Sequence, residues 1–214
     1  MLGGKYNEVV KEASSGTRTL LYTPDFKKLI GRNPHAVKTV QGLITRIQAM
    51  PQDQAHEPNS GKGTSSLEEN GVSVTLVKFP EKSDDFFKVE LEGKAFFVKK
   101  SGLESGWGGG AEEMNSLRSA ADVVKDLDKV KVVPCKLGFS DKSGNRYLVS
   151  EWLDYPRLDN HLQSLGVTEE GIRLKKRSME IESKLVDKFR DVMPRNMLYD
   201  PVSEIIYVYD ITLV

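Results

Sequence analysis

The chain has 214 residues, and its 31 basic and 31 acidic side chains give it no formal net charge at pH 7. This length suits one compact domain with an appendage, and the balanced charge provides no general attraction to nucleic acid or to an anionic membrane. The single cysteine, Cys135, excludes an internal disulfide and a cysteine-based zinc site, and it fits a reducing compartment.

The N-terminal sequence contains no apolar signal core, and no uninterrupted apolar run approaches the ~20 residues of a membrane-spanning helix. We therefore expect a cytoplasmic protein that has neither a membrane nor a nucleic-acid partner. Its function has to be sought in shorter motifs along the chain.

Residues 1–50 are predicted to form a helical N-terminal extension. Thr23-Pro24-Asp25 and Asn33-Pro34 both look like helix starts, and apolar residues follow each at three- and four-residue spacing. After the second start these residues are Val37, Val40, Ile44 and Ile47. Such stripes are typical of packing surfaces rather than of functional sites.

Polar and small residues dominate residues 51–71, which predicts a flexible linker or a long loop. Gly61-Lys62-Gly63-Thr64 in this segment is similar to the end of a phosphate-binding Walker A loop. That loop requires another glycine, separated by four residues from its Gly-Lys pair. His56 occupies that position and no apolar strand precedes it, so we interpret the segment as solvated linker.

From residue 72 onward, apolar and polar residues alternate as they do in strands. Strands are predicted at 72–79, 86–91 and 95–99, with a tight turn at 92–94 between the last two. Together they predict an antiparallel meander. Lys99 lies at the end of its third strand.

The glycine cluster Gly106-Trp107-Gly108-Gly109-Gly110-Ala111 follows the meander. It is similar to the G-x-G-x-x-A fingerprint of dinucleotide-binding folds, but no second βαβ unit comes after it, so a hinge loop is the better interpretation. A helix then opens with Glu112 and Glu113. Its apolar residues repeat at helical spacing: Leu117, Ala120, Val124 and Leu127.

A strand with Pro134 is predicted at 130–139, and a turn at 141–145 leads to a further strand at 146–153. Residues 158–162 are similar to the start of a helix. Thr168 is predicted to cap a longer helix that runs to about residue 189. The residues expected on its inner side are Ile172, Leu185, Val186 and Phe189.

The strongest functional signal follows this helix: an acid, Asp191, then an amide, Asn196, and a second acid, Asp210. Predicted strands at 197–199 and 205–209 form a hairpin, which sets Asn196 and Asp210 close together at its open end. One carboxylate can accept a hydroxyl proton, and amide and carboxylate oxygens can ligate Mg²⁺ beside a triphosphate. The arrangement suits metal-assisted phosphoryl transfer.

These segments resemble motifs of the protein-kinase-like superfamily. Residues 189–196 are similar to H-R-D-x-x-x-x-N, with Phe189 in place of the histidine, and Asp210-Ile211-Thr212 is similar to D-F-G. Residues 96–99 resemble the strand V-A-I-K. The order and spacing look more like those of compact small-molecule and atypical kinases, such as the aminoglycoside phosphotransferase group, than those of the large regulated protein kinases.

The resemblance implies a role for each catalytic candidate. Asp191 would accept or orient the substrate hydroxyl, while Asn196 and Asp210 would bind Mg²⁺. Lys99 would hold the phosphates of ATP. Glu113 would pair with Lys99 from the C helix, and Glu112 is the alternative partner.

The resemblance also implies a hinge that contacts adenine through its backbone. Ser150 would occupy the gatekeeper position, and Glu151, Trp152 and Leu153 would form the hinge. The implied fold is α+β, with an N-lobe of antiparallel sheet and C helix, the hinge, and a minimal, partly helical C-lobe. The domains would be the extension 1–50, the linker 51–71, the N-lobe and hinge 72–153, and the C-lobe 154–214.

The function implied is that of an ATP- and Mg²⁺-dependent phosphotransferase acting on a hydroxyl acceptor. Departures from the family pattern favour an alternative, a weak or inactive pseudokinase that serves as a nucleotide-binding or protein-interaction module. Residues 79–85 have three acids and no glycine, Phe97 replaces a small residue above adenine, and Ile211-Thr212 lacks the usual glycine. The chain also stops at Val214 before an activation segment. A third possibility is one piece of a larger kinase-like assembly, with a partner protein covering the short C-lobe.

Overall fold

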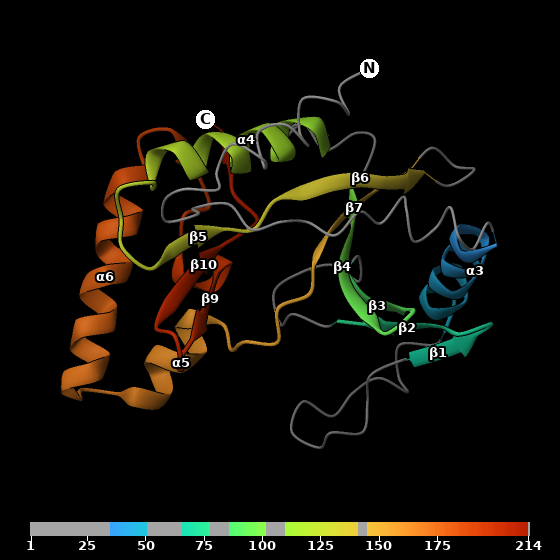
Figure 1. The fold of residues 1–214 in the computed structure, drawn as a ribbon, viewed down its shortest axis with the longest axis horizontal. Coiled ribbons are helices and arrows are strands. Elements are labelled where there is room, and N and C mark those ends of the chain that lie inside the picture. The colour runs from blue at the N-terminus through green and yellow to red at the C-terminus, as the bar shows by residue number, and fades with distance from the viewer. Residues whose placement is uncertain (1–34, 51–65, 78–85, 102–109, 141–144, 214) are drawn as a thin grey trace. The chain divides into compact units, whose positions relative to one another are not determined.

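The computed structural model describes residues 35–50, 66–77, 86–101, 110–140 and 145–213 (Figure 1). These residues divide into two compact units. The sheet unit comprises the described residues within 24–110 and 136–152, and the C-terminal unit comprises residues 111–135 and 153–213. No helix in these ranges combines the length and the apolar composition that a membrane crossing requires.

The sheet unit contains six strands in the order β1-β2-β3-β4-β7-β6. Their bounds are β1 Ser66–Glu69, β2 Val72–Leu76, β3 Phe86–Leu91, β4 Lys94–Ser101, β6 Cys135–Ser140 and β7 Arg146–Glu151. Each neighbouring pair from β1 to β7 is antiparallel. The predicted meander is therefore confirmed.

Two tight turns set the register of this meander. Asn70-Gly71 joins β1 to β2 and Glu92-Gly93 joins β3 to β4, and all four residues have φ angles between +51° and +74°. Two-residue turns of this kind match the right-handed twist of the strands, and Asn-Gly adopts them readily. Strand β1 consequently forms within the segment that the composition predicted as linker.

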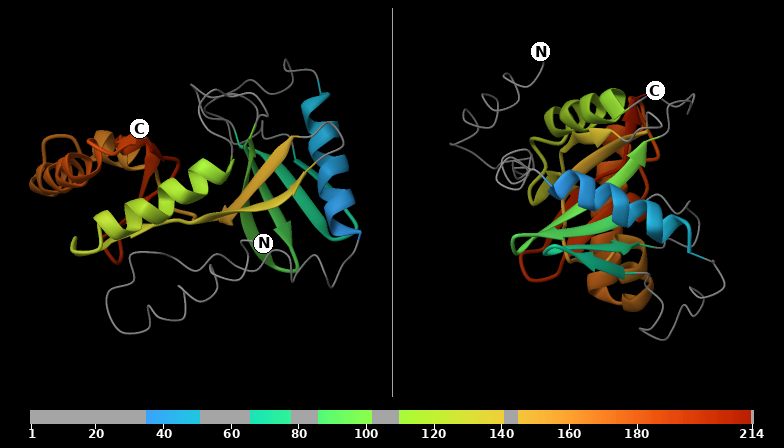
Figure 2. Two further views of the ribbon diagram at one scale, coloured as in Figure 1. Left: turned by 90° about the horizontal axis from the view of Figure 1, so that it is seen from above. Right: turned by 90° about the vertical axis from the view of Figure 1, so that its right-hand side faces the viewer.

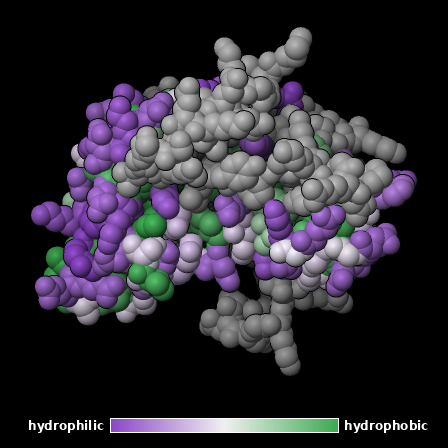
Figure 3. Space-filling view, in the orientation of Figure 1, coloured by the Kyte–Doolittle hydropathy of each residue, from purple (hydrophilic) through white to green (hydrophobic). Residues whose placement is uncertain are grey.

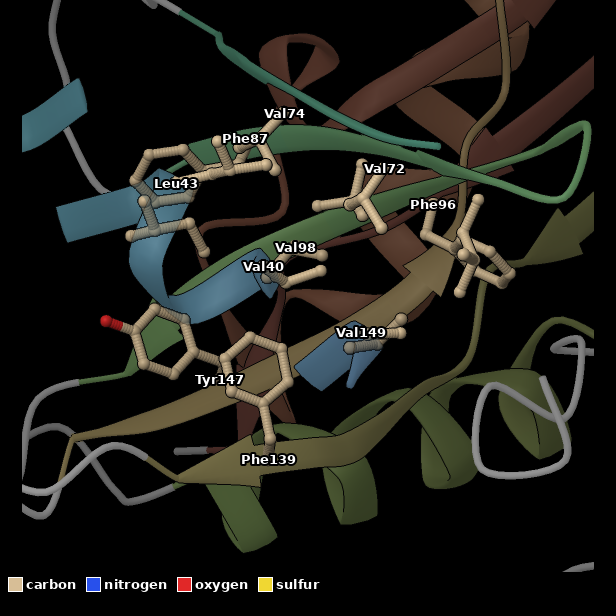
Figure 4. Close-up of a cluster of buried hydrophobic side chains, with 14 of the residues drawn as sticks. Val40, Leu43, Val72, Val74, Phe87, Phe96, Val98, Phe139, Tyr147 and Val149 are labelled. Atoms are coloured by element: carbon tan, nitrogen blue, oxygen red, sulfur yellow. The ribbon is translucent and has the colours of Figure 1, made fainter. Parts of the chain in front are cut away.

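One face of the sheet is covered by helix α3, Ala36–Gln48 (Figure 2). Its Val40 and Leu43 pack with strand residues such as Val74, Phe87 and Val98, whose side chains share that face because alternate residues of a strand point the same way (Figure 4). Burying one such aliphatic side chain stabilises the fold by about 1.5–3 kcal/mol. The apolar stripe predicted after Asn33-Pro34 is thus confirmed as a packing surface. The predictions for 23–25, 61–64, 79–85, 106–109 and 141–144 lie outside the described residues.

The C-terminal unit combines three helices with two small sheets. The helices are α4 Gly110–Val123, α5 Leu158–Leu165 and α6 Glu169–Leu185. One sheet has the order β5-β10-β9, from Val130–Val132, Ile205–Val208 and Met197–Asp200, and the other pairs β8 Phe189–Arg190 with β11 Thr212–Leu213. Antiparallel β9 and β10 form the predicted hairpin.

The strand predicted over 130–139 is two strands in different sheets. Strand β5 pairs in parallel with β10, and β6 belongs to the sheet of the other unit. Pro134 stands between them, and its missing N–H prevents it from donating to a strand ladder. The single-strand prediction was wrong because the proline ends one strand rather than lying within it.

Helix α6 begins where the sequence predicted, because Thr168 Oγ1 accepts a hydrogen bond from the Gly171 N–H at 3.1 Å. The prediction of its inner side was partly wrong. Leu185 is buried, but Ile172 and Val186 are each 59% exposed. The helix ends at Leu185 and not near residue 189, so the buried Phe189 lies beyond it in β8. The buried face is formed by Gly171, Leu174, Ser178, Ile181 and Leu185.

Helix α6 is tied to two neighbouring turns by a cluster of charges. Glu204, in the β9–β10 turn, accepts from Lys129 and from Arg173 Nη2, the latter at 2.8 Å. Arg177 donates to the carbonyl oxygens of Glu204 and Asp128, at 3.1 and 3.2 Å. The Lys129 ammonium, followed by Arg173, lowers the pKa of the Glu204 carboxyl.

This lowered pKa predicts a pH dependence of stability. Because the folded pKa of Glu204 lies below its ordinary value of 4.5, the contacts stabilise the fold above that pH and are lost as the pH falls through the folded pKa. We expect the free energy of unfolding to fall more steeply as the pH is lowered below about 4.5 in the unchanged protein than in Glu204→Gln. Urea unfolding at a series of pH values measures this, and Glu180→Gln, an exposed acid of α6, is the control. Identical slopes for Glu204→Gln and the unchanged protein would contradict the assignment.

Candidate functional site

Asn196 links the two predicted acids of the C-terminal unit. Its side chain is 2% exposed, and its Nδ2 donates to the backbone carbonyl oxygens of Asp191 at 2.8 Å and Asp210 at 3.2 Å. Because carbonyl oxygens only accept, the amide nitrogen has to face them. Asn196 and Asp210 therefore lie close together, as the hairpin predicted, and Asp191 also lies beside Asn196. We call these three residues the acid–amide cluster.

The backbone of both acids is left-handed, with φ angles of +59° at Asp191 and +53° at Asp210. Aspartate is among the few residues besides glycine that adopt this region readily. Strands β8 and β11 pair in antiparallel fashion close to both acids. Arg190, directly before Asp191, is opposite Thr212, two residues after Asp210. The short strands and the amide together hold the two left-handed residues in place.

Further contacts support the loop between Asp191 and Asn196. The Tyr209 hydroxyl donates to the carbonyl oxygen of Arg195 at 2.8 Å, and burial raises the pKa of Tyr209, which keeps the donor protonated. Arg195 Nη2 lies 3.7 Å from Asp191 Oδ1, and the two side chains are 38% and 58% exposed. An ion pair this exposed contributes little to stability. The Asp191 carboxylate is accessible to solvent because more than half of its side chain is exposed.

Helix α4 carries Glu113, which is half-buried. One turn further on, Ser116 is fully buried, and its Oγ accepts a hydrogen bond from the Leu213 N–H at 2.8 Å. The helix is therefore bonded to the strand that begins two residues after Asp210. Ser116 was not among the predicted site residues, and the one available signal was its position directly before Leu117 on the apolar side of the helix.

Lys99 lies on β4 in the sheet unit. It is paired with Phe86 of β3 and Leu148 of β7, on the face opposite to the one that α3 covers. The face that carries Lys99 also carries Phe97 and Ser150, which are directly paired. Lys99 and Glu113 belong to different units, so their pairing stays a prediction.

Phe97 takes part in a row of aromatic rings on this face. Its ring centroid lies 5.7 Å from that of Phe86 and 6.3 Å from that of Trp152. The Lys88 ammonium lies 5.4 Å from the centroid of the Trp152 ring, in position for a cation–π contact. Phe97, the large residue that the resemblance places above adenine, is thus part of a packed row of aromatic rings.

The hinge candidates follow β7 directly. The Trp152 N–H donates to the Ala95 carbonyl oxygen at 3.3 Å, which extends the ladder between β4 and β7. A backbone N–H carries one proton, so this one is already committed. The indole Nε1 of Trp152 is buried without a hydrogen-bond partner among the described residues. Burial also raises the pKa of the Glu151 carboxyl.

The acid–amide cluster fits Mg²⁺ held together with a nucleotide. With its nitrogen facing two carbonyls, Asn196 would offer Oδ1 as a ligand, and Asp210 would offer a carboxylate. Within the described ranges, no three His, Cys, Asp or Glu side chains converge as a metal cluster. Mg²⁺ commonly uses one or two protein ligands beside phosphate oxygens and water rather than a complete protein cage. A bound Mg²⁺ would neutralise phosphate charge.

No protein-family model and no curated protein matches this sequence. The solved structures that are similar to it include two kinases. The kinase PK-1 of the Cydia pomonella granulovirus is 17% identical, with a TM-score of 0.40 over 64% of this chain and 50% of that chain. Vaccinia related kinase 3 is 15% identical, with a TM-score of 0.40 over 74% of this chain and 54% of that chain. The chain spans about half the length of either kinase, and the likeness concerns the fold alone.

The fold is α+β, as the sequence predicted. The elements follow in the implied order: the antiparallel sheet with Lys99, helix α4, strands β6 and β7, helices α5 and α6, and the β9–β10 hairpin between Asn196 and Asp210. The structure brings together Asp191, Asn196 and Asp210 in one unit and places Lys99, Glu151 and Trp152 in the other. Leu153 and Glu113 belong to the C-terminal unit.

Proposed function

We propose that this chain binds ATP with Mg²⁺ and transfers a phosphoryl group to a hydroxyl acceptor. The observation that carries the proposal is the hydrogen bonding of Asn196 to the carbonyls of both Asp191 and Asp210. This bonding holds the backbone of two acids beside one buried amide, so that an amide and two acids meet within one loop region. Positioning and charge neutralisation provide most of the catalysis in phosphoryl transfer.

Each residue has a distinct part in this proposal. Lys99 would hold the nucleotide phosphates, with Glu113 as its positioning partner. Asp210 and Asn196 would hold Mg²⁺. Asp191, whose carboxylate is 58% exposed, would take the proton of the acceptor hydroxyl or orient that hydroxyl. Adenine would lie against the backbone of Glu151 and Leu153, because the Trp152 N–H already donates to Ala95.

A second candidate function is favoured by the aromatic row. Phe97, packed between Phe86 and Trp152, occupies the face on which a nucleotide base would lie. If these rings exclude adenine, the chain would be a pseudokinase that serves protein interaction. Whichever of the two functions the chain has, its acceptor and its protein partner belong to the proposal.

A thermal-shift titration distinguishes the two functions. We expect ATP with Mg²⁺ to raise the melting temperature, because ligand at 100 times its dissociation constant adds ~2.7 kcal/mol of stability. Mg²⁺ alone should give no shift, since the protein supplies only part of its ligands. Lys99→Ala should reduce the shift, and Lys94→Ala, at the exposed start of the same strand, should leave it unchanged. An unchanged melting temperature with ATP and Mg²⁺ together would favour the pseudokinase and refute the proposed activity.

A further inference from the structure

Helix α6 presents a row of apolar side chains to solvent. Ile172, Met179 and Val186, the last at the C-cap, are 59%, 60% and 59% exposed. They are seven residues apart, which is close to two helical turns, so they form one line along the helix. We call this line the α6 stripe. It faces away from the buried side of the helix, and hydrophobic residues are visible among hydrophilic ones over α6 in Figure 3.

Polar side chains flank the α6 stripe on both sides. Lys175 and Lys176 lie between Ile172 and Met179, and Glu182 and Ser183 lie between Met179 and Val186. Seven-residue spacing places Lys175 and Glu182 along one flank, which we call the charged flank. The same spacing places Lys176 and Ser183 along the other, which we call the lysine–serine flank. Both lysines are exposed, and neither makes a hydrogen bond or ion pair within the described chain.

Glu182 stands at a position where an acidic residue does not stabilise an isolated helix. Glu182 lies in the last turn of α6, where the helix dipole favours basic residues over acidic ones. It accepts a hydrogen bond from Ser178 Oγ at 2.7 Å, but no described cation pairs with it. Along the charged flank the base therefore comes first and the acid follows. This order suits a partner helix whose charges run in the opposite direction.

We propose that the α6 stripe pairs with the same stripe of a second copy of this chain, with the two helices antiparallel and a two-fold axis at Met179. Ile172 is seven residues before Met179 and Val186 is seven after it, so each Ile172 would lie against Val186 of the second copy. On the charged flank, Lys175 of each copy would face Glu182 of the other. A two-fold interface uses one self-complementary patch on both copies, and the α6 stripe has that property.

The flanking residues also select the antiparallel orientation. A two-fold axis parallel to the helices would turn the charged flank of one copy towards the lysine–serine flank of the other. Lys175 would then face Lys176 twice, and both Glu182 carboxylates would lack a basic partner. In the antiparallel pair, Lys175 faces Glu182, and Lys176 faces the Ser183 hydroxyl, which can accept a hydrogen bond from it.

The predicted interface is small. One helix–helix contact falls at the low end of specific interfaces, so the dimer should dissociate on dilution. The inference is independent of the proposed catalytic function, because none of the flanking residues belongs to the acid–amide cluster.

Charge reversal in the full-length chain tests the pairing. Sedimentation equilibrium across a concentration series should show a reversible monomer–dimer equilibrium for the unchanged protein. Lys175→Glu and Glu182→Lys should each dimerise at least about tenfold more weakly, because the charged flank then brings like charges together at two places. An equal mixture of these two variants should form a heterodimer of restored affinity, since each reversed charge meets its opposite.

Two controls separate pairing from a general effect of charge. Lys184→Glu makes the same change of charge as Lys175→Glu at an exposed position of α6 away from the stripe, and it should dimerise normally. Ser178→Ala removes the hydrogen bond to Glu182 without changing any charge, and it should also dimerise normally. Circular dichroism establishes that each variant keeps its helices.

The lysine–serine flank provides a test by gain of affinity. Ser183→Glu would place a carboxylate opposite Lys176 of the second copy at two symmetric positions. This variant should dimerise several-fold more tightly than the unchanged protein, and Ser183→Lys should dimerise more weakly. A general loss of structure cannot produce the tighter dimer, so this result does not depend on how well the weakened variants fold.

Cross-linking tests the orientation. Met179→Cys should form a disulfide-linked dimer under mild oxidation, because the two-fold axis places the two cysteines together. Ile172→Cys and Val186→Cys should cross-link when mixed but not separately. Cys135 is 5% exposed and should not take part.

Three results would overturn the proposal. The first is a chain that stays monomeric at every concentration, including the case in which another protein or further residues of the same polypeptide occupy the α6 stripe. The second is failure of the mixed Lys175→Glu and Glu182→Lys variants to associate. The third is cross-linking of Ile172→Cys with itself, which would indicate parallel helices.

Discussion

Replacing Asp191 by asparagine is expected to reduce phosphoryl transfer by at least about a hundredfold while leaving nucleotide binding nearly unchanged, because general-base groups contribute about 10²–10⁴-fold. The substitution removes the exposed carboxylate and nothing else of consequence. Asn196 bonds to the backbone carbonyl of residue 191, which the variant keeps, and asparagine tolerates the φ of +59°. Asp191→Ala should lose transfer equally.

Release of ADP from ATP, with water or the chain's own hydroxyls as acceptor, measures the loss without a known substrate. The ATP- and Mg²⁺-dependent thermal shift measures binding in the same samples. Asp187→Asn, an exposed acid in the segment that joins α6 to β8, is the matched control and should behave like the unchanged protein. Full turnover by Asp191→Asn would remove this residue from the proposed mechanism.

Among the substitutions considered for this chain, those of Asn196 should lower the free energy of unfolding most. Asn196→Ala removes the donor of two hydrogen bonds, and one such bond contributes about 0.5–1.5 kcal/mol, so the free energy of unfolding should fall by about 1–3 kcal/mol. Asn196→Asp should be worse than alanine, because a buried carboxylate would face the two carbonyls without a proton to donate. Urea unfolding without ligand measures both.

This ranking separates two roles of Asn196. If the residue served only as a metal ligand, aspartate would be the better tolerated substitution, since a carboxylate is a good Mg²⁺ ligand. If its amide holds the loop together, alanine is better tolerated than aspartate. Asn160→Asp, on the exposed side of α5, is the control for introducing an acid and should change stability little.

Patterns that depend on local spacing predicted much of this structure. The alternation from residue 72 gave the meander, Thr168 gave the start of α6, and the predicted hairpin placed Asn196 beside Asp210. The resemblance of the motifs also implied the order in which the elements follow along the chain. In each of these cases the signal lies within a short stretch of sequence, where strand and helix periods or capping groups act directly.

Features that depend on packing were missed. Ile172 and Val186 are apolar, and only the burial of Leu174 and Ile181 shows that α6 turns a different side towards its core. Ser116 has no distinguishing motif, because its partner is a backbone N–H nearly one hundred residues later. Strand β1 was hidden by its polar composition, although the Asn-Gly pair that follows it is a strong hairpin signal.

The bond between Ser116 and Leu213 fastens helix α4 to strand β11. A shift of α4 along its axis would pull on the strand that starts just beyond Asp210, and the left-handed turn at Asp210 would absorb the movement first. The helix that carries Glu113 and the loop that carries Asp210 would then move together. Helix α4 and the acid–amide cluster are thus connected through elements of the C-terminal unit alone.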